Sequence, residues 1–153
     1  MLDGFDGFYG HIRPISSIAG NLSISANYAL TNLEALTNLS TIGGYLKIFR
    51  NDSLTSLTGL ENVTYIGGSL EVENNDTLIS LTGLENLTHT GWSIKLRWND
   101  ALSSLAGLQN LDSIGGDLEI ADNDALENLA ELSNLTSTGG SLGIYNNDYL
   151  TSL

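Results

Sequence analysis

The chain has 153 residues and is strongly acidic, with 18 Asp and Glu residues against 5 Lys and Arg and a formal net charge of −13. That charge repels phosphate backbones and anionic lipid heads, so it argues against nucleic acid or a membrane surface as the main partner. No cysteine and only two histidines are present. Disulfides, thiolate chemistry and a histidine-based zinc site are therefore excluded, and we expect no cofactor and no metal. No apolar run approaches the ~20 residues that span a bilayer, so direct membrane insertion is not expected.

Residues 1–14 differ in pattern from the rest of the chain. They contain Phe5, Phe8, Tyr9 and Pro14, and they lack the basic and apolar regions of a signal peptide. A repeat array exposes its core at its ends unless a capping segment covers it. We therefore predict that residues 1–14 form an irregular segment or cap that covers the first repeat.

From about residue 15 the sequence repeats every 24 residues without an insertion. The clearest column is asparagine, at Asn27, Asn51, Asn75, Asn99, Asn123 and Asn147. A constant period places equivalent residues directly above one another, coil upon coil, as in a solenoid. We predict one repeat solenoid over residues 15–153, with five full coils and a truncated sixth, that continues beyond residue 153 in a longer parent protein.

Each coil contains one clear strand pattern. In the second coil the apolar Leu46 and Ile48 alternate with Tyr45, Lys47 and Phe49. This period of two predicts a short strand with one face inward. Stacking the coils then gives one principal parallel sheet.

The rest of each coil has an apolar residue at every third position. After the strand pattern of residues 45–49 these are Leu54, Leu57, Leu60, Val63 and Ile66. On an α-helix such a stripe would wrap around the surface, because each residue advances by ~100°. We predict a flattened coil with 3₁₀ pieces, little regular α-helix and a second short strand near residues 65–66.

Glycine and asparagine mark the corners of the coil. Glycine pairs precede the strand at Gly43-Gly44, Gly67-Gly68, Gly115-Gly116 and Gly139-Gly140. They predict a corner that needs positive φ or close backbone approach, although Trp92 replaces the second glycine in one coil. The Asn27-to-Asn147 column predicts a buried ladder whose amides bind backbone groups at the turn. A second asparagine column, expected at another corner, comprises Asn38, Asn62, Asn86, Asn110 and Asn134.

These motifs resemble the leucine-rich repeats of the receptor L-domain family. The resemblance rests on GLENLT at residues 83–88 and on IGGSLEVENN at residues 66–75, and it extends over about residues 15–153. It implies a right-handed parallel β-helix of the leucine-rich-repeat type. It also implies an extracellular ligand-binding module, as in growth-factor receptors, or a microbial surface protein with the same repeats.

Charged and aromatic residues gather on the outward strand positions. We call this set the sheet-face strip and predict that it is the ligand-binding surface: Tyr45, Lys47, Phe49, Arg50, Glu71, Glu73, Lys95, Arg97, Trp98 and Tyr145. Alternating signs alone would be explained by the avoidance of like-charge repulsion within the sheet. Aromatic rings on an exposed sheet face favour binding as the reason.

Other chemistries have weaker support. An aspartate column, Asp52, Asp76, Asp100, Asp124 and Asp148, would suit calcium, but local hydrogen bonds in the turn explain it better. Neither His11 nor His89 has an evident nucleophile partner in the sequence. Among the N-x-S/T sequons, Asn21 on an outward column is the best glycosylation acceptor, since most of the others belong to the two asparagine columns and are expected to turn inward.

We therefore predict a non-enzymatic binding or adhesion module of a secreted or cell-surface protein, with a protein or glycan as its partner. One alternative is a structural spacer that extends a surface protein. A second is a β-solenoid enzyme that acts on polysaccharide, which would need a groove with convergent polar groups.

Overall fold

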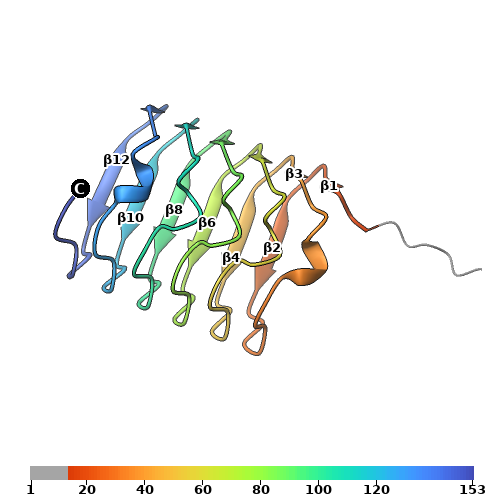
Figure 1. Ribbon diagram of the computed structural model, residues 1–153, viewed down its shortest axis with the longest axis horizontal. Helices are drawn as coiled ribbons and strands as arrows, with labels where there is room; N and C mark the ends of the chain where they lie inside the picture. The colour runs from red at the N-terminus through yellow and green to blue at the C-terminus, as the bar shows by residue number, and fades with distance from the viewer. Residues whose placement is uncertain (1–13) are drawn as a thin grey trace, which may run out of the picture.

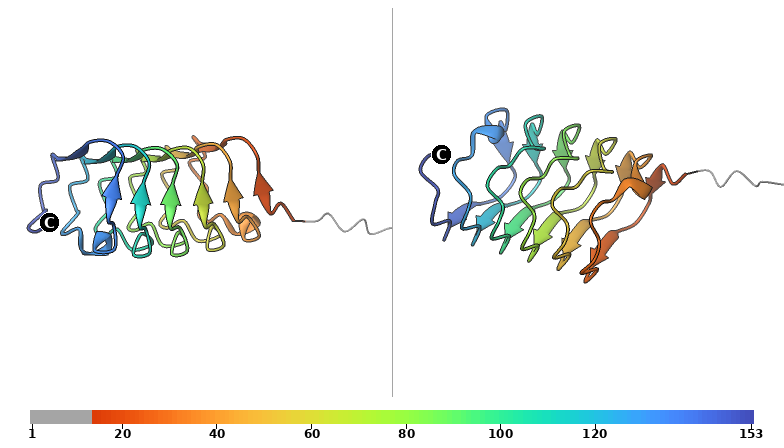
Figure 2. Two further views of the ribbon diagram at one scale, coloured as in Figure 1. Left: turned by 90° about the horizontal axis from the view of Figure 1, so that it is seen from above. Right: turned by 60° about the horizontal axis from the view of Figure 1, so that its bottom comes forward.

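The computed structural model describes residues 14–153, which form a parallel β-solenoid with two six-stranded sheets and almost no helix (Figure 1). The longer strands form the principal sheet: β2 (Leu22–Ser25), β4 (Leu46–Phe49), β6 (Leu70–Glu73), β8 (Ile94–Arg97), β10 (Leu118–Ala121) and β12 (Leu142–Tyr145). Figure 2 shows these strands side by side along the length of the solenoid. The predicted solenoid fold is confirmed.

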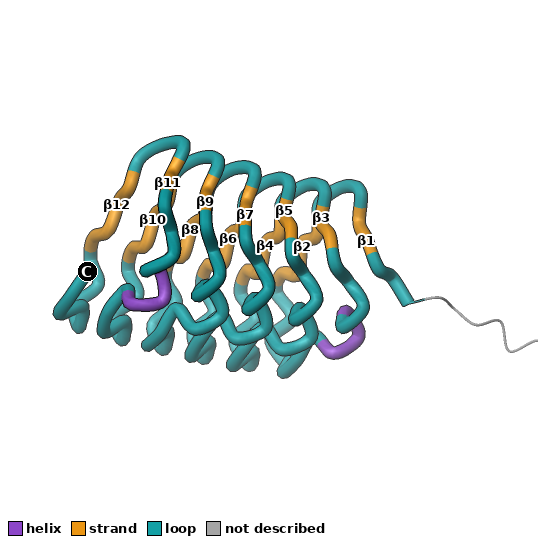
Figure 3. Tube along the Cα trace, turned by 45° about the horizontal axis from the view of Figure 1, so that its top comes forward, coloured by secondary structure: helices purple, strands orange, loops and turns teal. Residues whose placement is uncertain are grey.

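A second parallel sheet consists of two-residue strands. These are β1 (Ser17–Ile18), β3 (Thr41–Ile42), β5 (Tyr65–Ile66), β7 (His89–Thr90), β9 (Ser113–Ile114) and β11 (Ser137–Thr138), and Figure 3 shows them beside the principal sheet. The predicted strand near residues 65–66 is therefore present. It recurs in every coil as a complete second sheet.

The strands pair in strict 24-residue register. Leu46 of β4 lies opposite Leu70 of β6, and Leu70 lies opposite Ile94 of β8. This register stacks the apolar columns into one core. Leu54 and Leu57 are fully buried, as are the other members of the every-third-residue pattern.

Two short 3₁₀ helices, η1 (Glu34–Leu36) and η2 (Ala130–Leu132), lie in the connection from the long strands back to the short ones. Within residues 14–153, no helix has the length and apolar character that crossing a bilayer requires. The predicted cap, with its residues Phe5, Phe8 and Tyr9, falls outside the described part of the chain apart from Pro14.

The first glycine of each pair is needed for close approach of neighbouring coils. A Cβ built on Gly67 would lie 2.3 Å from the carbonyl oxygen of Gly43, and one built on Gly91 would lie 2.2 Å from that of Gly67. None of the described glycine pairs has a positive φ. Close approach is thus the reason for glycine at this corner, and conformational freedom is not.

At the coil-six end of the solenoid the apolar core is open. A hollow of about 320 Å³ is lined mainly by apolar side chains, among them Leu118, Leu142 and Ile144. Leu142 is 61% exposed, whereas its equivalent Leu118 in the previous coil is 1% exposed. Stacking of a further coil is what buries this column elsewhere in the fold.

Candidate functional site

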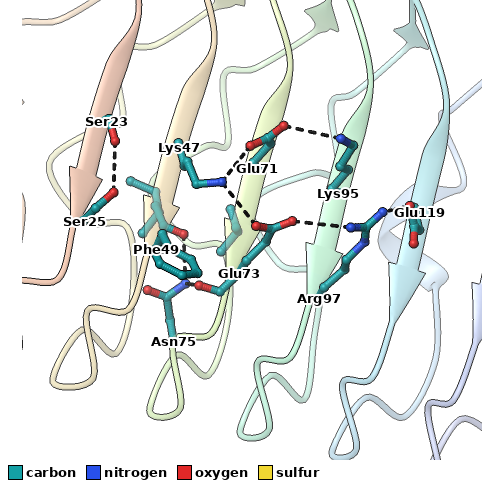
Figure 4. Close-up of polar contacts among 12 residues, drawn as sticks. Ser23, Ser25, Lys47, Phe49, Glu71, Glu73, Asn75, Lys95, Arg97 and Glu119 are labelled. Atoms are coloured by element: carbon teal, nitrogen blue, oxygen red, sulfur yellow. Dashed lines mark hydrogen bonds and ion pairs between the residues drawn. The ribbon is translucent and has the colours of Figure 1, made fainter.

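The sheet-face strip lies on the outward side of the principal sheet. Lys47 and Phe49 come from β4, and Lys95 and Arg97 come from β8. Glu71 and Glu73 project from β6 between them (Figure 4). These six side chains are neighbours because parallel strands in register lie ~4.8 Å apart.

Opposite charges on the strip pair in a continuous network. Lys47 Nζ lies 3.0 Å from Glu71 Oε2 and 3.3 Å from Glu73 Oε2. Lys95 Nζ lies 3.5 Å from Glu71 Oε1, and Arg97 Nη1 lies 3.8 Å from Glu73 Oε1. Arg97 also donates to Glu119 on β10. We call Lys47, Glu71, Glu73, Lys95, Arg97 and Glu119 the ion network (Figure 4).

The contacts shift the pKa values of the network in the direction that keeps it charged. Burial alone would raise the pKa of Glu71, but the hydrogen bond from Lys47 and the charges of Lys47 and Lys95 outweigh it and lower that pKa. The hydrogen bond from Arg97 lowers the pKa of Glu119. The same bond raises the pKa of Arg97.

Three cations and three carboxylates make the network electrically neutral. The strip is therefore not a basic patch on an acidic molecule, although four of its predicted residues are basic. Arg50 is the cation among residues 14–153 that forms no ion pair with a carboxylate. Within this part of the chain, Arg50 at one edge of the strip is thus the basic residue whose charge is free to meet a ligand.

Glu119 was missing from the predicted site. It occupies the same outward column as Lys47, Glu71 and Lys95 in the sequence, so the repeat register contained the signal that could have identified it. Its partner Tyr145, which was predicted, donates its hydroxyl hydrogen to Glu119. This bond raises the pKa of Tyr145.

The aromatic residues of the strip differ in how far they are committed to other contacts. Two cations contact the Phe49 ring, with Lys47 Nζ at 5.3 Å and Arg50 Cζ at 5.0 Å from its centroid. Trp98 is 45% exposed and has Arg97 Cζ 5.9 Å from its ring. Tyr45 and Tyr145 are exposed as well. The ring of Trp98 is therefore both accessible and held by a neighbour.

The residue after each long strand has a left-handed backbone, which the sequence analysis missed. Its φ is 53° in Arg50 and Trp98 and 54° in Asn74. The whole column is Ala26, Arg50, Asn74, Trp98, Asp122 and Asn146. Asn and Asp are enriched in this conformation, so their presence in the column is a signal that could have revealed it. The turn places Arg50 and Trp98 directly after β4 and β8, at the edge of the strip.

The asparagine column next to it forms a continuous ladder. Asn75 Nδ2 donates to the carbonyl oxygens of Ile48 and Glu73 at 3.1 and 3.0 Å, and to Asn99 Oδ1 at 3.1 Å. Asn75 Oδ1 accepts from the backbone N–H of Asn51 at 3.0 Å. Asn51, Asn75, Asn99 and Asn123 are fully buried. The ladder fixes the turn that positions Arg50 and Trp98.

The second asparagine column remains at the surface. Asn62, Asn86, Asn110 and Asn134 are exposed, and each donates its Nδ2 to a backbone carbonyl of the preceding coil at 2.7 Å. The expectation that these amides turn inward was wrong, because one bond to a surface carbonyl satisfies them. Asn21 is also exposed, and its Oδ1 accepts from Tyr45 N–H at 3.0 Å.

Metal and catalytic arrangements receive little support from the described residues. Residues 14–153 contain no group of three or more His, Asp or Glu side chains placed to hold a metal ion. His89 Nδ1 lies 2.9 Å from Ser113 Oγ, a contact that the sequence did not reveal, and the imidazole stacks on Tyr65. No carboxylate in that part of the chain hydrogen-bonds to His89, so the third group of a catalytic triad is not assembled there.

Comparison with known proteins gives one match. The model of the receptor L domain family matches residues 16–90, which run from just before β1 to the end of β7. No curated protein and no solved structure matches the chain. The resemblance inferred from the repeat motifs is confirmed over residues 16–90.

Proposed function

We infer that this chain, whose residues 16–90 belong to the receptor L domain family, is a binding or adhesion module that recognises a protein or a glycan through the sheet-face strip. Receptor L domains are ligand-binding, non-enzymatic modules of receptors. The family therefore supports binding as the general activity. The surface, the ligand class and the absence of catalysis are our proposal.

The observation that carries the proposal is the ion network with Trp98 beside it. Its charged side chains are 11–34% exposed and held in place by one another, so they lose little conformational freedom when a ligand arrives. Trp98 presents a large ring next to this rigid surface. A rigid aromatic anchor beside fixed polar groups is the pattern of an interaction hot spot.

The proposed location is the cell surface or the extracellular space. Receptor L domains occur in the extracellular regions of receptors. The large negative charge also suits a protein that must stay soluble and avoid anionic membrane surfaces.

A structural spacer is the second candidate, and one observation favours it. The charges of the ion network are satisfied internally, as expected for a sheet that only avoids like-charge repulsion. A spacer gives no reason for the exposed ring of Trp98. Among the aromatic and cation–π contacts of the described residues, this ring has one partner, Arg97. Trp98 therefore separates the two candidates.

The test uses the full chain as a labelled probe on a glycan array and on a panel of purified extracellular protein domains. Each ligand found is then titrated against Trp98→Ala. We expect this change to weaken binding by about 2 kcal/mol, roughly 30-fold in Kd, because it removes an aromatic anchor that the bound ligand would cover.

The matched control is Ile79→Ala, which removes another exposed apolar side chain outside the strip. It should leave affinity unchanged. Binding that survives Trp98→Ala, Tyr145→Ala and Arg97→Gln together would exclude the sheet-face strip as the binding surface.

A further inference from the structure

Trp92 occupies a corner position that the fold otherwise reserves for glycine. The equivalent residues in the neighbouring coils are Gly68 and Gly116. A Cβ built on Gly68 would lie 2.8 Å from the carbonyl carbon of Gly44 and 2.7 Å from Tyr45 N. Contacts this short do not occur for real Cβ atoms, so a side chain at this position requires the backbone to shift.

The shift is visible in the hydrogen bonds of the corner. Gly44 and Gly68 donate to the preceding coil at 2.8 Å each, whereas the bond from Trp92 N to Gly68 O is 3.1 Å. The next bond of this series, from Gly116 N to Trp92 O, is missing from the described residues, and the series resumes with the bond from Gly140 to Gly116 at 2.9 Å. Trp92 thus costs the corner one backbone hydrogen bond.

Thr90 accompanies this change in the same coil. It is fully buried in a core column that carries isoleucine at Ile42, Ile66 and Ile114 and threonine again at Thr138, whose Oγ1 donates to Gly140 O at 3.2 Å. Thr90 Oγ1 donates to Trp92 O at 2.9 Å and so satisfies the carbonyl that Gly116 no longer reaches. The cost of holding Trp92 is therefore the corner bond, and Thr90 Oγ1 takes the place of the Gly116 N–H at the Trp92 carbonyl.

The fold gains little packing in return, because Trp92 is 70% exposed. Residues that break a local structural rule without a structural gain concentrate at functional sites. Tyr65 is 43% exposed near this corner and stacks on His89, with ring centroids 6.1 Å apart and planes 17° apart. The released Gly116 N–H is a donor that lies close to the backbone of Trp92 and to Ser93, and Ser93 Oγ, which accepts from Asp117 N–H, keeps its own hydrogen for donation.

We propose that the corner formed by Trp92, Gly116, Ser93 and the Tyr65–His89 stack binds a neutral saccharide, at a surface separate from the sheet-face strip. An exposed indole stacks on the C–H face of a sugar ring, and the neighbouring N–H and hydroxyl donate to sugar oxygens. The equivalent positions in the adjacent coils, Gly68 and Gly116, carry no side chain. A net charge of −13 disfavours acidic sugars, whereas the hydroxyl oxygens of a neutral sugar can accept hydrogen bonds from the two donors of this corner.

The experiment uses the two tryptophans of the chain as separate reporters. Trp98→Phe leaves Trp92 as the fluorophore, and Trp92→Gly leaves Trp98. Each variant is titrated with cellohexaose, xylohexaose, mannohexaose, laminarihexaose and chitohexaose. We expect at least one hexasaccharide to shift the tryptophan fluorescence of Trp98→Phe to shorter wavelength in a saturable way and to reduce its quenching by acrylamide. The fluorescence of Trp92→Gly should not change.

Stability supplies a second, independent readout. Trp92→Gly should raise the urea midpoint, because it restores the glycine corner and its missing hydrogen bond. A purely structural role for Trp92 predicts a lower midpoint, and that result would overturn the proposal. It would also be overturned if no hexasaccharide protected Trp92, or if Trp92→Gly abolished binding to a protein domain and affected no saccharide. Variants of the sheet-face strip should leave the saccharide-induced change in Trp92 fluorescence intact. The two proposed surfaces can therefore be tested separately.

Discussion

Asn75 links three neighbouring coils through one buried amide. It donates to Ile48 O in the preceding coil and to Asn99 Oδ1 in the following one, and it accepts from Asn51 N–H. Every donor and acceptor of the amide faces a partner inside the protein, where no water replaces a lost bond. A buried group left without its partner costs about 1–3 kcal/mol.

Asn75→Ala should therefore lower the free energy of unfolding by about 1–3 kcal/mol, measured by urea denaturation. Asn86→Ala is the matched control, because the Asn86 amide is exposed and makes its one bond, to Glu61 O, at the surface. We expect a change of about 0.5 kcal/mol or less for the control. Equal effects of the two substitutions would contradict a special role of the buried ladder.

The ion network makes stability depend on pH. The folded-state pKa of Glu71 and of Glu119 is lowered, so each contributes stability that is present above its unfolded pKa and is lost as the pH falls through the folded pKa. The pKa of Lys47 is raised: burial opposes this, but the bonds and charges of Glu71 and Glu73 outweigh it. The Lys47 contribution is present below its unfolded pKa and is lost at strongly alkaline pH.

We expect thermal unfolding to show a loss of Tm as the pH falls below the ordinary range of a glutamate. The variant Glu71→Gln combined with Glu119→Gln should flatten this acid limb and leave the slope near neutral pH unchanged. Glu34→Gln combined with Glu127→Gln removes two exposed glutamates outside the network and serves as the control. An acid limb as steep in Glu71→Gln/Glu119→Gln as in the parent would show that the network is not its source.

At the scale of the element, one position decides whether a coil carries a 3₁₀ helix. Gly59, Gly83 and Gly107 have φ of 112–114°, and their coils make a tight turn. The equivalent residues Ala35 and Glu131 lie within η1 and η2. Glycine reaches this backbone conformation without strain, whereas residues with a Cβ adopt the 3₁₀ alternative.

Gly83→Ala should destabilise the protein by about 2 kcal/mol or more, because alanine resists this φ. Its Cβ would also lie 2.1 Å from Leu57 O in the preceding coil. Ala35→Gly, at the position where the chain already forms η1, is expected to cost about 1 kcal/mol or less. A crystal structure of Gly83→Ala that retained the tight turn, with unchanged stability, would contradict this account.

At the scale of the whole molecule, the negative charge is concentrated by the repeat. The aspartates Asp52, Asp76, Asp100, Asp124 and Asp148 recur once per coil, and parallel coils are ~4.8 Å apart. None of these carboxylates accepts a hydrogen bond from the described residues, so the local turn bonds expected for them are not formed. The column is a line of solvated like charges.

Salt should consequently raise the Tm of the parent protein, because it screens repulsion along the column. The double change Asp76→Asn and Asp100→Asn should raise the Tm at low salt and make little difference at high salt. Asp112→Asn, outside the column, is the matched control. A chelator that lowers the Tm of the parent and leaves the double variant unaffected would instead demonstrate a bound cation.

The repeat pattern was enough to predict the solenoid, its 24-residue coil, the inward strand positions and the apolar core. A repeat without insertions allows only one stacking register, so Leu46, Leu70 and Ile94 had to align. The every-third-residue pattern excluded a regular α-helix, because on a helix the apolar stripe would not stay on one face. The glycine pairs marked a corner, although close approach and positive φ remained alternatives there.

The pairing of charges on the surface could not be predicted in this way, because it depends on the three-dimensional arrangement of the side chains. Lys47 pairs with Glu71, which lies directly opposite, and with Glu73, which lies on the diagonal. Arg97 pairs with Glu119 on the neighbouring strand β10. These choices depend on side-chain conformations and distances between coils, which a column of residue types does not contain. The same limit applies to Trp92, since its cost to the fold becomes visible only where the backbone of one coil meets that of the next.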